Sequence, residues 1–404
     1  MIEAQRLRAA ALAAAAALAC GTAIGCGSSD DADSSASTPA AASTDGGGSG
    51  SGGGAPGGAP GLAEAKANVE RWLKGTSTEP VTDGAPRMAA GKRIWVISCG
   101  QSLSSCARGT KGAVEAARAV GWSAQVFDTK GDLSSAGDGI RQAIAAKADG
   151  IYSYFIDCSY MRKPLEEAKA AGIPVVQSEG VDCDQSDPGA PSLFTWTTSY
   201  VEGDMLTWIR DFGRAMTSYL IASTEGKGNI LYVADNAAIS TRAVVAGFKQ
   251  EIDTCGECES KVVEYSFDEI ARGLSQRVQD ELLRNPGISA VGVAYDALLN
   301  GGVSEGVQQA ERTGRELTLT AGEGQDATMD LVRDGVVAAG VGLDNEWEGW
   351  SAVDSLNRLF AGRRPVSSGI GIQLYDKDHN TPESGPYVST VDFRSAYKKA
   401  WGVD

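Results

Sequence analysis

The stretch RIWVISCGQSLSSCARGTKGAVEAARAVG, Arg93–Gly121, joins a strand to a helix through one short loop. RIWVIS is an apolar run that is typical of a buried strand. After the loop, apolar residues recur at helical spacing, and Gly121 is a typical C-terminal stop. These apolar residues are Ala113, Ala116, Ala117 and Val120. The stretch therefore predicts one β-α unit.

The same alternation continues along the chain. Further strand-like runs are SAQVFD, DGIYSYFID and IPVVQS, and then, after a helix rich in Trp and Met over residues 201–219, NILYVAD, KVVEYSF, ISAVGVAYD, ELTLTAG and VVAAGVG. Such a series predicts an α/β fold with two doubly wound, Rossmann-like parallel sheets. Open α/β sheets bind ligands beyond the carboxyl ends of their strands. We therefore expect a ligand cleft between the two lobes, at the strand-to-helix junctions.

The N-terminus predicts export. Arg6 and Arg8 precede an uncharged Ala/Leu-rich run, so residues 1–25 are expected to be a signal peptide. AIGC before GSSDD resembles a lipoprotein processing box, which makes Cys26 the predicted lipidated residue. Cys20 is the competing site, and an ordinary secreted protein is the third alternative. Residues 26–61 are almost wholly Ser, Ala, Gly, Pro, Thr and Asp, a composition that predicts a disordered tether. The protein is thus expected outside the cytoplasm, anchored to the bacterial cell membrane by an N-terminal lipid.

Charge, length and hydropathy argue against a nucleic-acid-binding protein, a single compact core and a further membrane-spanning segment. The formal net charge of −16 and the absence of a Lys/Arg cluster argue against a nucleic-acid partner. The chain after the tether is too long for one compact core and suits two lobes. No second stretch of 18 apolar residues follows the signal, so the lipid is the only membrane contact that we expect.

Six cysteines remain after Cys20 and Cys26, an even number that in an exported protein indicates disulfides. For Cys99 and Cys106, a zinc site would need further ligands, yet His379 is the only histidine and no paired CxxC sets occur. A redox pair would need CxxC spacing. We therefore expect a disulfide that closes a short loop, and we predict neither a metal nor a cofactor.

Several weak motifs occur in a shared order: GAVEAARAVGW, AIAAKADGI, LEEAKAAGIPVV, TRAVVAGF, RNPGISAVGVAYDALLNGG, LVRDGVVAAGVG and GWSAVDSLNRLFAG. In this order the chain resembles the type I periplasmic binding proteins, the ribose-binding-protein-like sugar receptors of bacterial ABC importers, over roughly residues 91–400. The resemblance implies a chain that crosses between lobes three times, near residues 197–199, 343–345 and 370–374. It implies a lead-in at 62–92, a first lobe of 93–198 plus 346–370, and a second lobe of 199–345 plus 371–404.

The resemblance also bears on the other cysteines. In a sheet ordered 2-1-3-4-5 the third and fourth strands are neighbours, so Cys158 and Cys183, which follow them, are expected to pair. Cys255 and Cys258 form CGEC just past a helix end. In an exported protein this pair is expected to be a local turn staple, with an oxidoreductase centre as the alternative.

Polar and aromatic residues at the strand ends are the candidate ligand groups, because carboxylates, amides and guanidinium satisfy sugar hydroxyls. They are Gln101, Ser102, Asp157, Glu179, Trp196, Arg242, Tyr295, Asp296 and Glu323. Arg242 matches the family's sugar-binding arginine but equally fits a solvated helix charge. Asp296 matches a family Asp, although Tyr295 precedes it here, and it equally fits a helix cap. Glu179 and Glu323 stand where relatives have Asp, which points to a smaller ligand or one with amine groups.

The sequence bears on three candidate functions. The resemblance implies a monomeric solute-binding protein that closes its lobes on a small polar ligand, a sugar or sugar-like compound, and delivers it to an ABC transporter permease. A sensor subunit that presents bound solute to a membrane receptor or kinase would need the same lobes. An exported hydrolase would have to use His379, which has no nucleophile-elbow motif nearby, so we do not expect an enzyme.

Overall fold

A computed structural model describes residues 59, 61–235, 238–265 and 273–403. The predicted signal peptide (1–25), both lipidation candidates Cys20 and Cys26, and the predicted tether as far as residue 58, with residue 60, lie outside the described residues. Within the described residues, no helix is long and apolar enough to cross a membrane.

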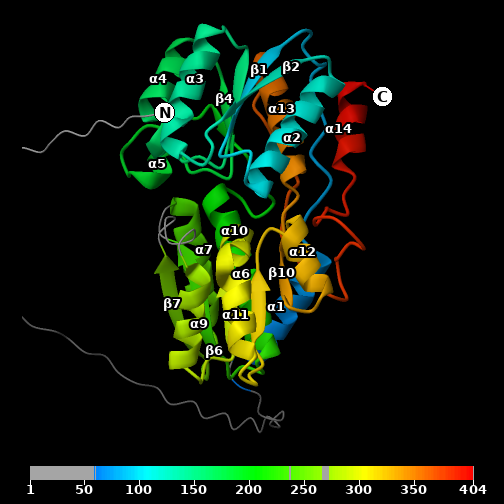
Figure 1. Cartoon of the computed structure of the whole chain (residues 1–404). Helices are drawn as coiled ribbons and strands as arrows, with labels where there is room; N and C mark the ends of the chain where they lie inside the picture. The colour runs from blue at the N-terminus through cyan, green and yellow to red at the C-terminus, as the bar shows by residue number, and fades with distance from the viewer. Residues whose placement is uncertain (1–58, 60, 236–237, 266–272, 404) are drawn as a thin grey trace, which may run out of the picture. The chain divides into compact units, whose positions relative to one another are not determined.

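The first sheet has five parallel strands in the order β2-β1-β3-β4-β5. Its elements are β1 (Arg93–Ser98), α2 (Ser104–Ala119), β2 (Ser123–Asp128), α3 (Ala136–Ala145), β3 (Gly150–Tyr154), α4 (Arg162–Ala170), β4 (Val175–Ser178), α5 (Cys183–Ser186) and β5 (Trp196–Thr197). A later helix, α13 (Asn345–Phe360), packs against α2, β3 and β4, while α3 and α4 pack together. We call this sheet and its helices the first lobe, the upper one in Figure 1.

The second sheet has six strands in the order β11-β10-β9-β8-β6-β7. Its elements are α6 (Met205–Ser223), β6 (Asn229–Asp235), α7 (Ile239–Ile252), β7 (Glu259–Tyr265), α9 (Leu274–Arg284), β8 (Ala290–Val293), α10 (Asp296–Leu298), α11 (Ser304–Glu311), β9 (Thr318–Ala321), α12 (Asp326–Arg333), β10 (Ala339–Gly342) and β11 (Gln373–Asp376). The prediction of two doubly wound α/β sheets is confirmed, with one difference: β11 runs antiparallel to β10 at the sheet edge. We call this sheet and its helices the second lobe.

Helix pairs in both lobes meet through glycines. A Cβ on Gly349 of α13 would collide with the backbone of α2 at Gly109, Gly112 and Ala113. In the second lobe, a Cβ on Gly247 of α7 would collide with the backbone of Arg210 in α6. Glycine at these positions therefore allows each pair of helices to pack backbone against backbone.

The chain passes between the lobes more often than expected. Besides the three expected crossings, α1 (Leu62–Lys74) packs against α6 and β11 of the second lobe before the chain enters β1. The segment that follows α1 lies along the crossing at 369–372: Thr76 N–H donates to Ile372 O over 2.9 Å, and Thr78 N–H to Gly369 O over 2.9 Å. A fifth connection is the segment from β11 to the last helix, residues 377–392. In the described residues, five segments thus connect the lobes.

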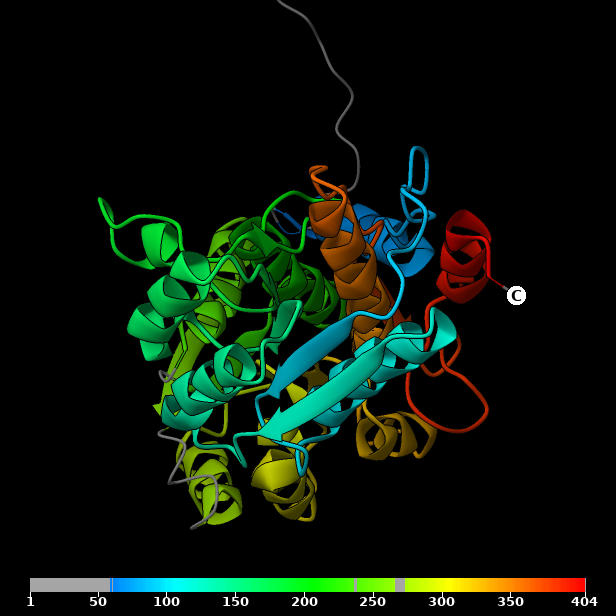
Figure 2. The same ribbon diagram turned by 90° about the horizontal axis from the view of Figure 1, so that it is seen from above.

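The expected assignment of residues 371–404 to the second lobe is wrong for the last helix, α14 (Phe393–Trp401), which packs on α13. Trp401 stacks on Trp350 with ring centroids 5.3 Å apart, and Phe393 stacks on Trp347 at 5.2 Å. These buried aromatic side chains need an apolar partner, which the first lobe provides. Figures 1 and 2 show α14 in red on the side of the first lobe away from α3 and α4. The other predicted lobe boundaries stay predictions.

All six cysteines of the described residues are paired as expected. The bonds are Cys99–Cys106, Cys158–Cys183 and Cys255–Cys258, with Cα atoms 5.6, 5.2 and 5.4 Å apart. The first bond closes the loop between β1 and α2. The second joins the loops that follow β3 and β4, which are neighbours in the sheet.

Candidate ligand-binding site

A cavity of about 430 Å³ is lined by residues of both lobes, at the carboxyl ends of their strands. The first lobe contributes Ser102 and Leu103 of the loop after β1 and the first three residues of α2, with Leu133, Phe155 and Tyr160. The second lobe contributes Asp235 at the end of β6, Thr241 in α7, the start of α10 and the loop between β9 and α12. A volume of this size is typical of small-molecule sites.

Four of the nine predicted ligand residues line this cavity: Ser102, Tyr295, Asp296 and Glu323. A fifth, Glu179, lines a smaller adjoining cavity of about 30 Å³, which Tyr295 and Glu323 also line. Gln101, Asp157, Trp196 and Arg242 line neither of the two cavities. No bound ligand tests any of these roles, so the roles stay predictions.

The four residues outside the cavities have other surroundings. The side-chain amide of Gln101 donates to Ser98 Oγ over 2.6 Å, and so folds back on its own loop. The carboxylate of Asp157 accepts hydrogen bonds from the backbone N–H groups of Val181 and Ile239. Trp196 is half-buried on the edge strand β5, with the Arg364 guanidinium 5.5 Å from its ring centroid. Arg242 is exposed on α7.

Several polar residues of the cavity were not predicted from the sequence, among them Asp235, Thr241 and Gln325. Asp235 is the last residue of β6, so the strand-end rule that selected Asp296 would also have selected it. Gln325 lies two residues after the predicted Glu323. Thr241 directly precedes the predicted Arg242, but its side chain is buried and donates to Asp235 Oδ1 over 3.3 Å. Which of these two neighbours lines the cavity depends on the rotation of α7.

The acidic groups of the cavity form a chain of hydrogen bonds. The Tyr295 hydroxyl donates to Asp235 Oδ2. Asp296 N–H donates to Glu323 Oε2 over 3.2 Å, and Gln325 N–H donates to Asp296 Oδ2 over 2.7 Å. Asp296 is therefore not the cap of α10: it is the first residue of that helix, and its carboxylate is held by the loop after β9.

Burial raises the pKa values of two of these carboxyl groups, those of Glu323 and Asp296. For Glu323, burial and then the charge of Glu179 raise the pKa to about 7. For Asp296, burial and then the charge of Glu323 raise the pKa well above its usual value. A carboxylate that is buried beside another carboxylate favours its protonated form unless a positive charge or further donors reach it.

Three non-glycine residues at the cavities have left-handed backbone conformations. They are Phe155, Glu179 and Glu323, with φ of 54°, 55° and 62°. Each follows the end of a strand, namely β3, β4 and β9. Such conformations cost on the order of 1 kcal/mol each and gather where a side chain is held for binding. All three residues line one or both cavities.

The lobes touch around the cavity through direct hydrogen bonds. Ser104 Oγ in α2 donates to Gln325 Oε1 over 2.9 Å, and Gln325 Nε2 donates to Asn345 Oδ1 over 3.0 Å. Asp157, after β3, accepts from Ile239 N–H at the start of α7 over 3.2 Å. These contacts describe a closed arrangement of the two lobes around the cavity.

A buried polar network lies behind the smaller cavity. The Tyr154 hydroxyl lies 2.6 Å from Glu179 Oε1 and 2.9 Å from Glu348 Oε2, and the Tyr200 hydroxyl donates to Glu348 Oε1 over 2.7 Å. Burial and the charge of Glu348 raise the pKa of Glu179 well above its usual value, and burial raises the pKa of Glu348. One proton shared within this pair relieves the repulsion.

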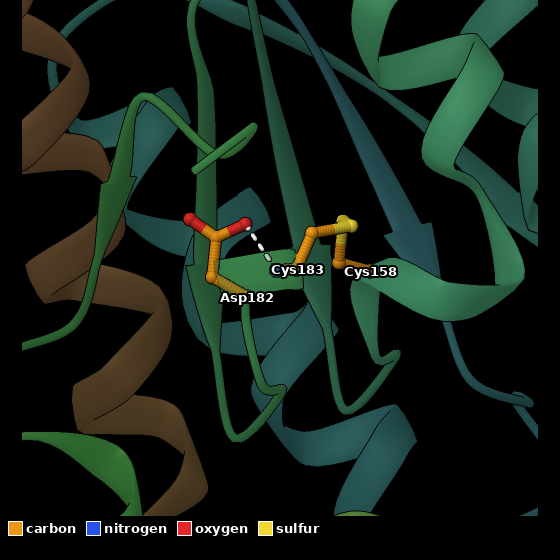
Figure 3. A group of neighbouring side chains, drawn as sticks. All are labelled: Cys158, Asp182 and Cys183. Carbon is orange, nitrogen blue, oxygen red and sulfur yellow. Dashed lines mark hydrogen bonds between the residues drawn. A yellow bond between two sulfur atoms is a disulfide. The ribbon is translucent and has the colours of Figure 1, made fainter. Parts of the chain in front are cut away.

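Figure 3 shows Cys158, Asp182 and Cys183, whose ligand atoms lie within 4.8 Å of one another. The two sulfur atoms are joined in a disulfide and so offer no thiolate. Asp182 caps α5 and accepts from Cys183 N–H over 2.7 Å and from Leu193 N–H over 3.0 Å. This group of side chains is thus explained by local structure.

His379 lies apart from both cavities. It is exposed, and its Nδ1 is 2.8 Å from Asp376 Oδ1. The polar groups that line the cavities are carboxylates, amides and hydroxyls that hydrogen-bond to one another and to the backbone. Such groups are suited to hold a polar molecule between two lobes.

Two α/β lobes that enclose a cavity with several polar groups at their strand ends define a cleft-type binding protein. The periplasmic binding protein domain family matches residues 105–364, and the chain belongs to this family. No curated protein matches the chain in sequence.

Solved structures share the fold at low identity. A periplasmic solute-binding protein of an ABC transporter from Actinobacillus succinogenes, with bound D-allose, is 16% identical, with 71% of this chain and 98% of that chain covered and a TM-score of 0.60. A solute-binding protein from Mycobacterium smegmatis, with bound glycerol, is 18% identical, with 74% and 100% covered and a TM-score of 0.61. The arabinose-binding component from Shewanella sp. ANA-3, bound to L-arabinofuranose, is 18% identical, with 76% and 95% covered and a TM-score of 0.58.

Proposed function

We propose that the protein is an extracytoplasmic solute-binding protein of an ABC transporter, anchored by a lipid on Cys26, that acts as a monomer without changing its ligand chemically. It binds a small polar compound, a sugar, polyol or related molecule, in the cavity between the lobes. The observation that carries the proposal is this cavity, about 430 Å³ in volume and lined by polar groups of both lobes. The family match and the sugars and glycerol bound to similar structures support it.

The proposed ligand residues are the four predicted ones that line the cavity, Ser102, Tyr295, Asp296 and Glu323, joined by Asp235 and Gln325. Phe155 and Tyr160 offer apolar faces on the first-lobe side. Because binding groups come from both lobes, a ligand favours the closed arrangement over an open one. That preference is what a permease can recognise.

The test is a thermal-shift screen of the exported protein against sugars, polyols, amino acids and amines, since a ligand of the folded state raises the melting midpoint. A polar solute that raises the midpoint, with isothermal titration giving one site per chain, supports the proposal. Absence of any shift across the panel contradicts it. Uptake of the labelled ligand by cells with and without the protein tests delivery to the transporter. Mass spectrometry of the N-terminal peptide tests the lipid anchor, and comparison of Cys26→Ser with Cys20→Ser tests which cysteine carries it. No feature of the described residues favours the sensory alternative.

A further inference from the structure

The cavity between the lobes is lined by acidic side chains. Asp235, Asp296 and Glu323 line its second-lobe side, and Asp326 lines it as an exposed residue. Among the described residues that line the cavity there is no Lys and no Arg. As far as the described residues show, a ligand that enters therefore meets carboxyl groups and no basic side chain.

The nearest basic group is already engaged. Arg108 of α2 lowers the pKa of Glu323, but burial and Glu179 outweigh it, and the pKa remains at about 7. The Arg108 guanidinium lies 3.7 Å from Asp344 Oδ1 and donates to Tyr387 O over 3.0 Å. The guanidinium is thus held by Asp344 and Tyr387, and Arg108 does not line the cavity.

Asp296 lines the cavity with a buried carboxyl group. The residue is 1% exposed, and its Oδ2 is held by Gln325 N–H over 2.7 Å. Its Oδ1 is buried and has no hydrogen-bond partner among the described residues. A buried acceptor left without a donor costs about 1–3 kcal/mol, so a ligand that donates to it gains affinity.

Aromatic rings complete the lining. Phe155 and Tyr160 line the cavity from the first lobe, and Tyr295 lines it beside Asp296. The faces of aromatic rings carry negative potential and attract cations, as the carboxylates do. Carboxylates and aromatic rings together, without a basic residue, are the surroundings that suit an ammonium group.

We infer that the ligand is a small hydroxylated compound that carries a protonated amine, with the ammonium group held beside Asp296 and Glu323. The inference rests on the proposed function and specifies its ligand class. An ammonium group donates several hydrogen bonds and brings a compensating positive charge, whereas a hydroxyl donates one bond and brings no charge. A neutral sugar brings no positive charge to Asp296 and Glu323.

Isothermal titration with four probes tests the inference: glucosamine, glucose, N-acetylglucosamine and putrescine. Glucosamine and glucose are of nearly equal size and differ in an ammonium against a hydroxyl group at C2, whereas N-acetylglucosamine keeps the nitrogen as a neutral amide and adds an acetyl group. We expect glucosamine to bind about tenfold or more tightly than glucose and N-acetylglucosamine, which is about 1.4 kcal/mol. We expect this preference to disappear in Glu323→Gln and in Asp296→Asn.

Asp334→Asn is the matched control, because Asp334 is an exposed carboxylate after α12 that does not line the cavity. Asp334→Asn changes the net charge by the same amount as either cavity variant and should keep the preference for glucosamine. The melting midpoint of each variant without ligand shows that it is folded. Both cavity variants remove a like-charge contact, so their midpoints should not fall.

The outcomes separate the inference from the proposed function. Glucose or N-acetylglucosamine binding as tightly as glucosamine overturns the inference and leaves a sugar receptor. Putrescine binding alone supports the ammonium site and contradicts a sugar-like ligand. If none of the four probes binds, the inference is overturned, and the wider thermal-shift screen then decides the proposed function.

Discussion

Asp157, which follows β3 in the first lobe, accepts a hydrogen bond from the backbone N–H of Ile239, the first residue of α7 in the second lobe, over 3.2 Å. The other carboxylate oxygen accepts from Val181 N–H over 2.9 Å. The strand-end rule selected Asp157 as a ligand residue, but its carboxylate connects the lobes directly and does not line the cavity. We therefore expect Asp157 to affect binding through closure of the lobes.

Asp157→Asn should weaken ligand binding about tenfold without abolishing it. An amide can keep the bond to Val181 N–H but places an NH₂ group against Ile239 N–H. One charge-assisted hydrogen bond of about 1.5 kcal/mol is then lost, and only the closed state contains that bond. Titration of the ligand found by the screen measures the affinity, and small-angle scattering without ligand measures opening. Asp184→Asn, an exposed carboxylate of the same lobe, is the control. Unchanged affinity and scattering in Asp157→Asn would show that this bond does not hold the lobes closed.

Glu348→Gln should flatten the dependence of stability on pH. Burial raises the pKa of Glu348 and of its neighbour Glu179, so the folded protein keeps a proton that the unfolded chain loses above its ordinary pKa of 4.5. Since the folded state binds more protons, the free energy of unfolding falls as pH rises from that value through the raised pKa. The variant removes one of the two titrating groups.

Urea unfolding between about pH 5 and pH 8 measures this slope for the variant and the wild type. Glu166→Gln, on the exposed face of α4, should leave the slope as it is. Asp296 and Glu323 add to the slope with the same sign, so the difference between variant and wild type is the quantity to compare. A variant slope equal to or steeper than that of the wild type contradicts the prediction.

Loss of the Cys99–Cys106 bond should reduce both stability and ligand affinity. By the chain-entropy estimate, a closed loop of about eight residues contributes on the order of 2.5 kcal/mol. Because Ser102 and its neighbours up to Cys106 line the cavity, binding would then have to order this loop. Chemical unfolding and titration of the double Cys→Ser variant measure the two effects.

The Cys255–Cys258 bond provides the comparison, since neither cysteine lines the cavity. Its double Cys→Ser variant should lose stability and keep its affinity. Equal affinities in the two double variants would mean that the first bond has no part in arranging the site.

Gly349→Ala should destabilise the first lobe by about 1–3 kcal/mol. The new Cβ would meet the backbone of α2 at Gly109 and Ala113, which cannot move aside as a flexible side chain can. Gly287→Ala is the control, because its Cβ would meet only the Asn229 side chain at 3.7 Å. Thermal unfolding of both variants measures the difference, and equal midpoints would contradict the close approach of α2 and α13.

The sequence predicted the β-α series and the strand ends well, because both depend on local apolar pattern and on a general property of parallel sheets. Ser102, Tyr295, Asp296 and Glu323 lie at such ends and do line the cavity. Side-chain direction was not predictable, because it depends on tertiary contacts. Gln101 is turned back by Ser98, and the rotation of α7 directs Thr241 inward and leaves Arg242 exposed.

The position of α14 was not predictable for a similar reason. Its apolar face fits either lobe by pattern alone, and the choice follows from the aromatic side chains of α13. The antiparallel direction of β11 likewise results from the path of the chain after α13.

Two of the five connecting segments were not expected from the sequence, one between α1 and β1 and one between β11 and α14. If the lobes separate, these two segments have to follow the movement together with the other three. Each is fixed at both ends, the first by α1 on α6 and the second by α14 on α13. Five connections restrict the separation of the lobes more than three would, so we expect the cleft of this protein to open less widely than that of a protein with three crossings.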